Sequence, residues 1–424
     1  MPTLIRKFLS AICLPITFSK FICETKELLN VGWKLSASML LECALSTNSV
    51  LFVGRHDKTE KAAVSFADLI ITTICILPGF GIVTVCNTYI SNSNGEQLRY
   101  KQEIILQKAL LLCIIISLLI CPLLLNMENI LILLYQDPEI SFLAGRFCMV
   151  YIAGVPILLW SLVLSRFLQC RGHVCVVLIM LAFTVAVNFL LNYIFIIVLD
   201  GGLRIAAAVL VVSQYIYFLM LVVYFYWNGE ITGVFMKESL ENWYDFSVCV
   251  FNGFLLFIFE QLNLAFGFFL CGLVGAKEVD VFALFDIIVN CTFMITSGFS
   301  TAMSIKIGEK LGVNEHAEAK TLACVDYIFT LIYNVVVFLI LIVPIKYVGR
   351  LFTDDMDVIL ELSNNVIVIA IHEVTDITSA MLDGILEACG RQCVSSSLSL
   401  LSNIISIPAA IYVAFALDKI TTGL

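Results

Sequence analysis

The stretch "ALLLCIIISLLICPLLL" at Ala109–Leu125 contains no charged side chain, and neither does "IFTLIYNVVVFLILIVPI" at Ile328–Ile345. A helix needs about 20 mainly apolar residues to cross the hydrocarbon core of a bilayer, and these runs match that length. Of the 424 residues, 61% are hydrophobic and 13% are charged, whereas a soluble domain carries about 25% charged residues. The sequence therefore predicts a polytopic membrane protein without a soluble domain.

Eleven apolar segments are predicted to cross the membrane. They cover residues 29–53, 63–91, 104–126, 141–165, 174–199, 203–227, 246–274, 279–305, 321–346, 358–387 and 393–417. These segments are too long and too uniformly apolar for barrel strands, so we expect an all-α fold. Basic residues such as Arg166, Arg171 and Lys310 favour one side of the membrane and predict a cytosolic N-terminus.

The two halves of the chain resemble each other at one constant shift of 218 residues, which we call the repeat shift. "LFVG" at 51–54 falls on "FLCG" at 269–272, and "QDPEI" at 136–140 falls on "DDMDV" at 354–358. Six crossings per repeat would place both halves the same way up, around an axis along the membrane normal with a V-shaped cleft between them. The predicted parts are a cytosolic lead (1–28), a first six-helix bundle (29–228), a cytosolic linker (229–245) and a second bundle (246–424).

The second bundle is expected to contain five segments instead of six. The segment at 203–227 predicts a twelfth segment near 421–445, but the sequence ends at Leu424. A shortened form, an incomplete gene model and a natural eleven-helix protein would all give this sequence.

Acidic residues lie inside several apolar segments. At the repeat shift, Glu260 falls on Glu42, and Asp286 falls on Asp68. On the helix that contains Glu260, Asn263 lies on the same face. The segment at 358–387 is the most acidic, and it carries His372, Glu373, Asp376, Ser379, Asp383 and Glu387 along one stripe. Such faces predict a helix interface or a watery cavity in place of contact with lipid.

A carboxylate in hydrocarbon costs at least ~2.5–3.5 kcal/mol, so such residues usually mark a transport pathway. Burial favours the neutral acid, which can then exchange protons near physiological pH. A deprotonated acid attracts a cation and a protonated acid releases it, which is the chemistry of proton-for-cation exchange. The alternative is that each acid only hydrogen-bonds a neighbouring helix. No catalytic residue, metal site or cofactor is expected, and the 16 cysteines are interpreted as small packing residues.

Several stretches resemble the multidrug and toxic compound extrusion family, in particular its animal and plant branch. They are "LQCRGHVCVVLIMLAFTVAVNFLLNYIF" at 168–195, "GFSTAMSIKIGEKLGVNEHAEA" at 298–319, the loops "LLYQDPEI" and "LFTDDMDVI", and "DGILEACGRQ" at 383–392. The resemblance covers about residues 28–417. It implies a twelve-helix, two-lobed exporter of organic cations, driven by protons in eukaryotic members, with Glu260 and Asp376 at the positions of family acids. The chain departs from the family pattern at Asn87, Gln261, Ala265, Asp286 and Glu387.

The leading hypothesis is a monomeric plasma-membrane antiporter that exchanges protons, or alternatively sodium ions, for organic cations. The candidate residues are Glu260, Asp376, Glu42, Asp286, Asp68, Glu373, Asn263 and Gln261. A non-transporting protein that regulates a full-length relative is the second hypothesis. A lipid flippase is disfavoured because no basic residue is expected in the interior to hold a phosphate. An intramembrane enzyme is disfavoured because no nucleophile or metal pattern occurs, and no nucleic-acid partner is expected.

Overall fold

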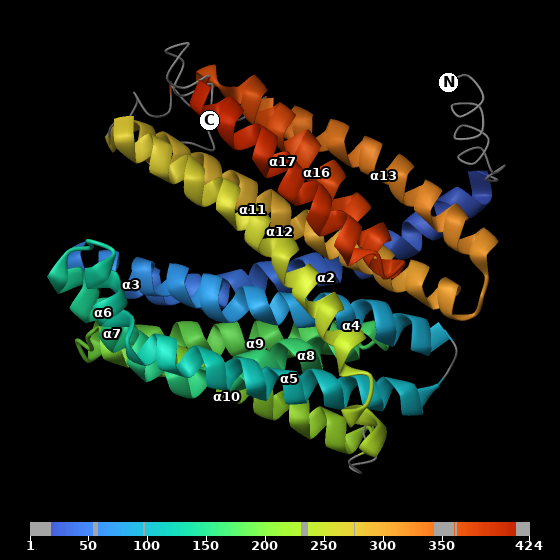
Figure 1. The fold of residues 1–424 in the computed structure, drawn as a ribbon, viewed down its shortest axis with the longest axis horizontal. Helices are drawn as coiled ribbons and strands as arrows, with labels where there is room; N and C mark the ends of the chain where they lie inside the picture. Colours follow the sequence, from blue (N-terminus) through green and yellow to red (C-terminus); the bar gives the residue numbers. More distant parts are fainter. Residues whose placement is uncertain are drawn as a thin grey trace. The chain divides into compact units, whose positions relative to one another are not determined.

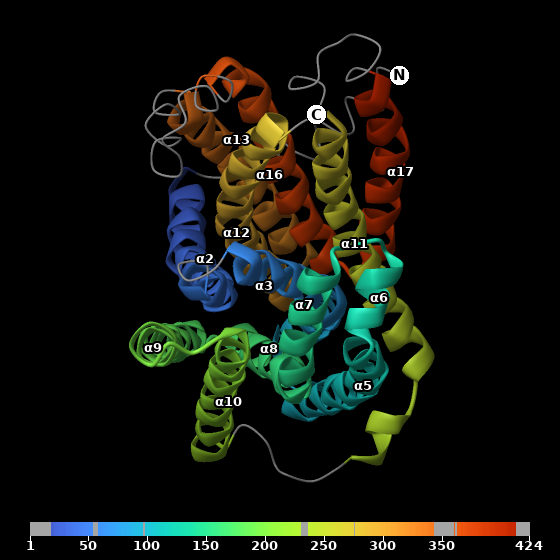
Figure 2. The same cartoon turned by 90° about the vertical axis from the view of Figure 1, so that its left-hand side faces the viewer.

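The computed structural model describes residues 18–53, 58–95, 98–229, 236–274, 276–342, 360 and 363–412, and these residues form helices and turns without a strand. The chain divides into two compact units. Unit 1 contains Met1–Ser36 and Leu255–Leu424, and unit 2 contains Ala37–Phe254. Each unit is a bundle of long helices, drawn in two views in Figures 1 and 2.

Unit 2 is a bundle of consecutive helices joined by short turns. Its elements are α3 (Lys58–Ile71), η1 (Thr72–Ile76), α4 (Leu77–Gly95), α5 (Arg99–Leu125), α6 (Met127–Leu133), α7 (Pro138–Tyr151), η2 (Ile152–Gly154), α8 (Val155–Cys170), α9 (Val174–Asn192), η3 (Tyr193–Val198), α10 (Leu203–Trp227) and η4 (Lys237–Leu240). Helix α4 packs against α5 and α8, and α10 packs against α7, α8 and α9. Asp137 caps α7 because its carboxylate accepts the backbone N–H of Glu139 at 2.9 Å.

Unit 1 is built around α16. It contains α12 (Ala276–Gly312), α13 (His316–Ile342), α16 (Val366–Ala388) and α17 (Gln392–Ile411), and α16 packs against the other three. Its core contains Val281, Leu284, Ile288, Val337, Leu341, Ile369 and Ile377. The apolar faces of α12, α13 and α16 therefore meet in one hydrophobic cluster.

Two long helices contribute to both units. Helix α2 (Phe18–Val53) passes from unit 1 to unit 2 after Ser36, and α11 (Trp243–Val274) passes from unit 2 to unit 1 after Phe254. The repeat shift that places "LFVG" at 51–54 on "FLCG" at 269–272 also places Ser36 on Phe254. The division into units therefore follows the internal repeat of the sequence.

Two helix crossings are close enough to require glycine. In unit 1, the Cβ of any other residue at Gly298 would overlap the backbone of Ser36 on α2. The Ser36 hydroxyl donates a hydrogen bond to the carbonyl of Ile295 at 2.6 Å. In unit 2, a Cβ at Gly81 of α4 would lie 2.8 Å from the carbonyl oxygen of Val250 on α11. Helix backbones approach most closely at such small residues.

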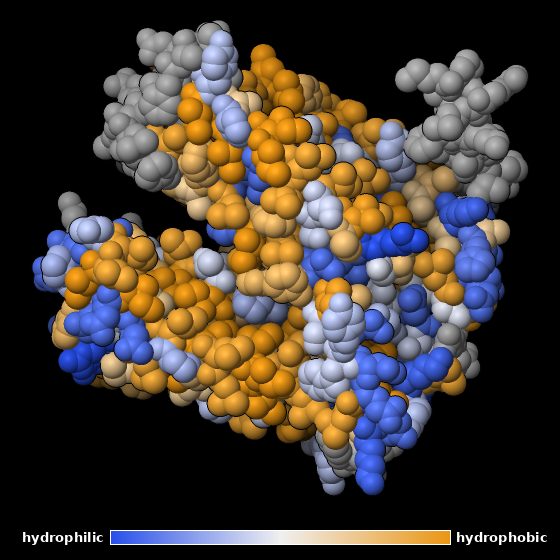
Figure 3. Space-filling model, viewed as in Figure 1, coloured by the Kyte–Doolittle hydropathy of each residue, from blue (hydrophilic) through white to orange (hydrophobic). Residues whose placement is uncertain are grey.

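The prediction of a polytopic all-α membrane protein is confirmed. Ten stretches of helix among the described residues are long and apolar enough to cross a membrane. In Figure 3 hydrophobic residues cover broad areas of the visible surface. On α5, Leu118 and Leu119 are exposed, as expected for side chains that face lipid.

Each of the eleven predicted segments corresponds to a helix among the described residues, with some differences at the ends. Helix α2 begins at Phe18, inside the predicted lead, and α12 continues to Gly312 instead of ending at 305. The predicted segment at 63–91 is formed by α3, η1 and α4, of which η1 is a π-helical turn. The loop "LFTDDMDVI" at 351–359 and the predicted twelfth segment lie outside the described residues.

Candidate functional site

Acidic side chains of α11 and α16 gather in unit 1. Glu260 of α11 interacts electrostatically with Asp376 and Asp383 of α16. Asp376 also interacts with Glu373 and with His372. The spacing along α16 explains this arrangement, because residues three, four and seven apart on a helix lie on one face. The structure thus brings four carboxyl groups and one imidazole into one cluster, which we call the acid cluster.

Neutral side chains surround the acid cluster. Glu373 is fully buried, and Thr292 of α12 and Tyr333 of α13 lie beside it. Asp383 accepts a hydrogen bond from the hydroxyl of Ser395 on α17. The His372 ring contacts Phe285 of α12 edge-on, with the ring centroids 5.2 Å apart. These neighbours carry no positive charge that would neutralise the carboxylates.

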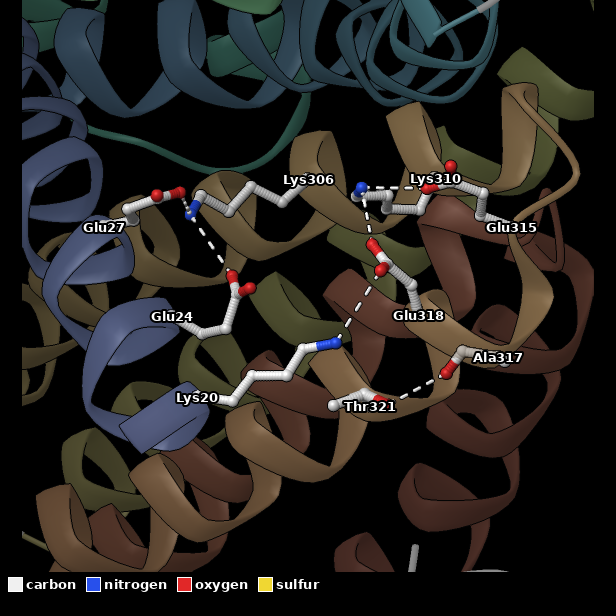
Figure 4. A network of polar contacts seen from close by, with 9 residues as sticks. All are labelled: Lys20, Glu24, Glu27, Lys306, Lys310, Glu315, Ala317, Glu318 and Thr321. Atoms are coloured by element: carbon white, nitrogen blue, oxygen red, sulfur yellow. Dashed lines mark hydrogen bonds and ion pairs between the residues drawn. The ribbon is translucent and has the colours of Figure 1, made fainter. Parts of the chain in front are cut away.

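Lys20 of α2 and two lysines of α12, Lys306 and Lys310, belong to a separate ion-pair network at the helix ends (Figure 4). The charged members of this network are Lys20, Glu24, Glu27, Lys306, Lys310, Glu315 and Glu318. Lys306 Nζ lies 2.7 Å from Glu27 Oε2, and Lys310 Nζ lies 2.6 Å from Glu318 Oε2. The network joins the first turns of α2 to the end of α12 and the start of α13. Lys306 and Lys310 therefore pair with carboxylates of this network and form no ion pair with the acid cluster in the part of the chain that the structure describes.

The two polar residues beside Glu260 differ in their surroundings. Asn263 hydrogen-bonds with Asn403 of α17 and accepts a hydrogen bond from Ser406 at 3.3 Å. Asn403 also donates to the carbonyl of Phe259 at 2.7 Å. Asn263 therefore joins α11 to α17. Gln261 is half-buried and follows Glu260 directly.

Asp286 is not a member of the acid cluster as its electrostatic interactions define it. It is half-buried on α12, directly after Phe285. Among the residues that the structure describes, it makes no electrostatic interaction with the acids of α11 and α16. The repeat pairing of Asp286 with Asp68 therefore does not place it beside Glu260.

Glu42 of unit 2 differs electrostatically from its repeat partner Glu260. Glu42 interacts with Arg166 of α8, and both interact with Tyr217 of α10. Arg166 is only 7% exposed, and its Nη1 has no hydrogen-bond partner within the described part of the chain. The expectation that the interior lacks a basic residue was therefore wrong. The long side chain of Arg166 begins near the end of α8 and is covered by neighbouring helices, which sequence position does not reveal.

Asp68 and a group of amides complete the polar interior of unit 2. Asp68 of α3 interacts electrostatically with Tyr151 of α7. The side chain of Asn188 accepts a hydrogen bond from Asn48 at 3.2 Å and donates one to Ser213 at 3.0 Å. These bonds join α2, α9 and α10 inside unit 2.

Among the residues that the structure describes, three buried charged residues were not predicted to lie in the interior. They are Glu103, Arg166, and Asp326 in the middle of α13, which is only 1% exposed. The signal for Asp326 was present, because Asp326, Thr330 and Asn334 follow one another at helical spacing in an apolar segment.

A protein-family model, MatE, matches the chain twice, over residues 35–194 and 254–412. The first match begins beside Ser36 and the second begins at Phe254, and these two positions are related by the repeat shift. The family matches therefore agree with the internal repeat found in the sequence.

Sequence relatives of this chain are named multidrug and toxin extrusion proteins, and solved structures of MATE transporters share its fold. Multidrug and toxin extrusion protein 1 of Homo sapiens is 26% identical over 418 residues, which cover 96% of this chain and 72% of that protein. The Danio rerio protein of the same name is 25% identical over 415 residues, with 97% and 70% covered.

Among solved structures, the eukaryotic MATE transporter AtDTX14 shares the fold with a TM-score of 0.87 at 19% identity, covering 95% of this chain and 92% of that one. The Vibrio cholerae MATE transporter VcmN has a TM-score of 0.84 at 16% identity, with 95% and 93% covered. Because the family model matches most of the chain in both halves, this protein belongs to the MatE family of multi-pass membrane transporters.

Proposed function

We propose that this protein exports organic cations in exchange for protons. The observation that carries the proposal is the acid cluster, in which Glu260, Asp376, Glu373 and Asp383 interact while Lys306 and Lys310 are paired elsewhere. Ionised carboxylates in such a cluster attract cations, and protonation removes their negative charge. Relatives named multidrug and toxin extrusion proteins support a small-molecule substrate.

The proposed mechanism makes protons and the substrate cation compete for the same carboxylates. Deprotonated Glu260 and Asp376 hold the cation, and protonation of either one weakens its binding and favours release. Asp376 is central because it interacts with Glu260, Glu373 and His372. A change at one acid therefore alters the charge state of the others, as expected for coupled titrating groups. Protons are the proposed coupling ion, with sodium as the alternative.

The remaining candidate residues receive different proposed roles. Asn263 holds α11 against α17, which fixes the position of Glu260, and Gln261 contributes to substrate choice. Glu42 is partly neutralised by Arg166, so it contributes less to cation binding than Glu260 does. Asp68 and Asp286 are not members of the acid cluster, and we propose that they influence transport indirectly. We propose a monomer in the plasma membrane with a cytosolic N-terminus.

The test uses the full chain reconstituted in liposomes with an imposed pH gradient. Uptake of radiolabelled tetraethylammonium is followed with and without sodium. Glu260→Gln and Asp376→Asn are expected to abolish uptake driven by the gradient. Glu139→Gln, at an exposed acid of α7, is the control and should leave uptake unchanged. Unaltered uptake in both variants would refute the assignment, uptake driven only by sodium would refute proton coupling, and absence of uptake by the unaltered chain would favour the regulatory hypothesis.

A further inference from the structure

Helix α13 carries a buried polar stripe that consists of Asp326, Thr330 and Asn334. Their side chains are 1%, 2% and 5% exposed, respectively. Residues four apart lie on the same face of a helix and are separated by about 6 Å along its axis. Because α13 packs against α12 and α16, the stripe runs through the interior of unit 1.

One end of the stripe reaches α16 close to the acid cluster. The amide of Asn334 donates a hydrogen bond to the Thr378 hydroxyl at 2.8 Å. Thr378 follows Asp376 by two residues on α16. At the next position along α13, the Thr330 hydroxyl donates to the backbone carbonyl of Asp326 at 2.8 Å. The Asn334 bond therefore ties the stripe to α16, whereas the Thr330 bond stays within α13 and does not involve the Asp326 carboxyl group.

Asp326 itself is a carboxyl group without a hydrogen-bond partner. Neither Oδ1 nor Oδ2 has a partner among the described residues. An ionised carboxylate in this position would lack both water and a compensating charge, which is strongly unfavourable. A proton on one of its oxygens removes that charge.

The titratable groups on the helices packed against α13 are engaged with other residues or lie at other positions along the bundle. On α12, Lys306 and Lys310 are members of the ion-pair network. On α16, the titratable groups are His372, Glu373, Asp376, Asp383 and Glu387. Of these, Asp383 accepts from Ser395, and Asp376 interacts with His372 and Glu373. The sequence of α12 contains four acids, Glu278, Asp280, Asp286 and Glu309, and burial is the dominant influence on Asp326.

A metal ion fits Asp326 less well than a proton does. A cation such as calcium or magnesium needs about six oxygen ligands, whereas a proton needs one. No group of three or more His, Cys, Asp or Glu residues with the arrangement of a metal site occurs in the part of the chain that the structure describes.

We propose that Asp326 is a proton-binding site of the transport cycle, separate from the acid cluster. Asp326 takes up one proton from water on one side of the membrane and becomes neutral, and in another state of the cycle it releases that proton to water on the other side and becomes a carboxylate again. The inference rests on the proposed proton-coupled function, and it adds a residue that cation binding itself does not require.

The test separates proton-driven transport from cation exchange in proteoliposomes. Net tetraethylammonium uptake driven by a pH gradient requires protonation, whereas exchange of labelled for unlabelled tetraethylammonium at equal pH does not. Asp326→Asn is expected to reduce net uptake at least ~10-fold and to retain exchange. Glu260→Gln is expected to lose both activities because it removes the cation site. Asp326→Glu should restore net uptake, and Tyr327→Phe, at the exposed neighbouring position, is the matched control.

Other results would overturn the inference. If Asp326→Asn takes up cations under the gradient as fast as the unaltered chain, Asp326 does not carry a coupled proton. If it loses exchange together with net uptake and melts at a lower temperature, its role is structural. Thr330→Val keeps the side-chain shape and removes only a hydrogen bond to the backbone of Asp326, so it is a second control and should retain both net uptake and exchange. Failure of the proposed function gives a different pattern, because then the unaltered chain itself shows no uptake driven by protons.

Discussion

The close approach of α4 and α11 in unit 2 makes a sharp prediction about Gly81. A Cβ at this position would lie 2.8 Å from the carbonyl oxygen of Val250 and 2.9 Å from the backbone nitrogen of Phe254. Gly79, two residues earlier on α4, provides a matched comparison. There a Cβ would lie 2.9 Å from methyl groups of Leu159 and Leu162. The predicted clash distances are nearly equal, but backbone opposes one substitution and flexible side chains oppose the other.

The difference between the two substitutions follows from these distances. Ordinary contact begins at 3.4 Å, so Gly81→Ala must move the α11 backbone by about 0.5 Å, an overpacking strain of roughly 1–3 kcal/mol. At Gly79, the two leucines can rotate, which costs about 0.5–1.5 kcal/mol. Both substitutions gain similar helix propensity, about 1 kcal/mol, and this gain cancels in the comparison. Gly81→Ala should therefore be less stable than Gly79→Ala by about 1–2 kcal/mol.

Thermal unfolding in detergent, followed by tryptophan fluorescence at a fixed scan rate, measures this difference. At roughly 2–4 °C per kcal/mol for a unit of this size, Gly81→Ala should melt about 2–8 °C below Gly79→Ala. Gly202→Ala is the neutral control, because its nearest neighbour is a Glu60 side-chain oxygen at 3.6 Å. Equal midpoints for Gly81→Ala and Gly79→Ala, or a lower midpoint for Gly79→Ala, would refute the argument from backbone contact.

Three further substitutions have definite expected outcomes. Asn188→Ala removes the partner of Asn48 and Ser213, so it should lower the unfolding free energy by about 1–3 kcal/mol, measurable as a lower melting temperature than that of Asn48→Ala. Lys306→Met breaks a partly exposed ion pair and should cost under about 1 kcal/mol, an effect that should disappear in high salt. Gly384→Ala places a Cβ 2.7 Å from the backbone oxygen of Ser300 and should destabilise the packing of α12 on α16 by roughly 1–3 kcal/mol, detected as a lower yield of monodisperse protein than for Gly202→Ala.

The helices of this fold could be predicted because lipid imposes a simple requirement on sequence. A segment such as Ala109–Leu125 is uniformly apolar, and in a bilayer only helical hydrogen bonding satisfies its backbone. Helix ends were predicted less well, since α2 continues below the membrane segment to Phe18 and α12 continues to Gly312. These extensions are held by ion pairs such as Lys306–Glu27, which depend on tertiary packing and leave no apolar signal.

The candidate site could be predicted in part. The acids of α16 lie on one face because of helical spacing, and the sequence alone shows this spacing. Which acids interact with Glu260 depends on how α11 and α16 are arranged within unit 1. Sequence spacing alone did not show that Asp376 interacts with Glu260 and that Asp286 does not. The burial of Arg166 and Asp326 likewise depends on which helices pack around them. The sequence does not show this packing, so the burial of these two side chains could not be predicted from it.

Helices α2 and α11 each contribute to both units, and this makes the two repeats depend on each other for folding. Each repeat gives the beginning of its leading helix to the unit built mainly by the other repeat, and the two crossover points, after Ser36 and after Phe254, are equivalent positions of the repeat. This is the arrangement of a domain-swapped dimer, with the two partners fused into one polypeptide. A single repeat alone would leave the glycine-lined face of its second helix uncovered. Each repeat therefore depends on the other for the helix that covers this glycine-lined face, so the two repeats are expected to fold as one cooperative chain and not as two independent domains.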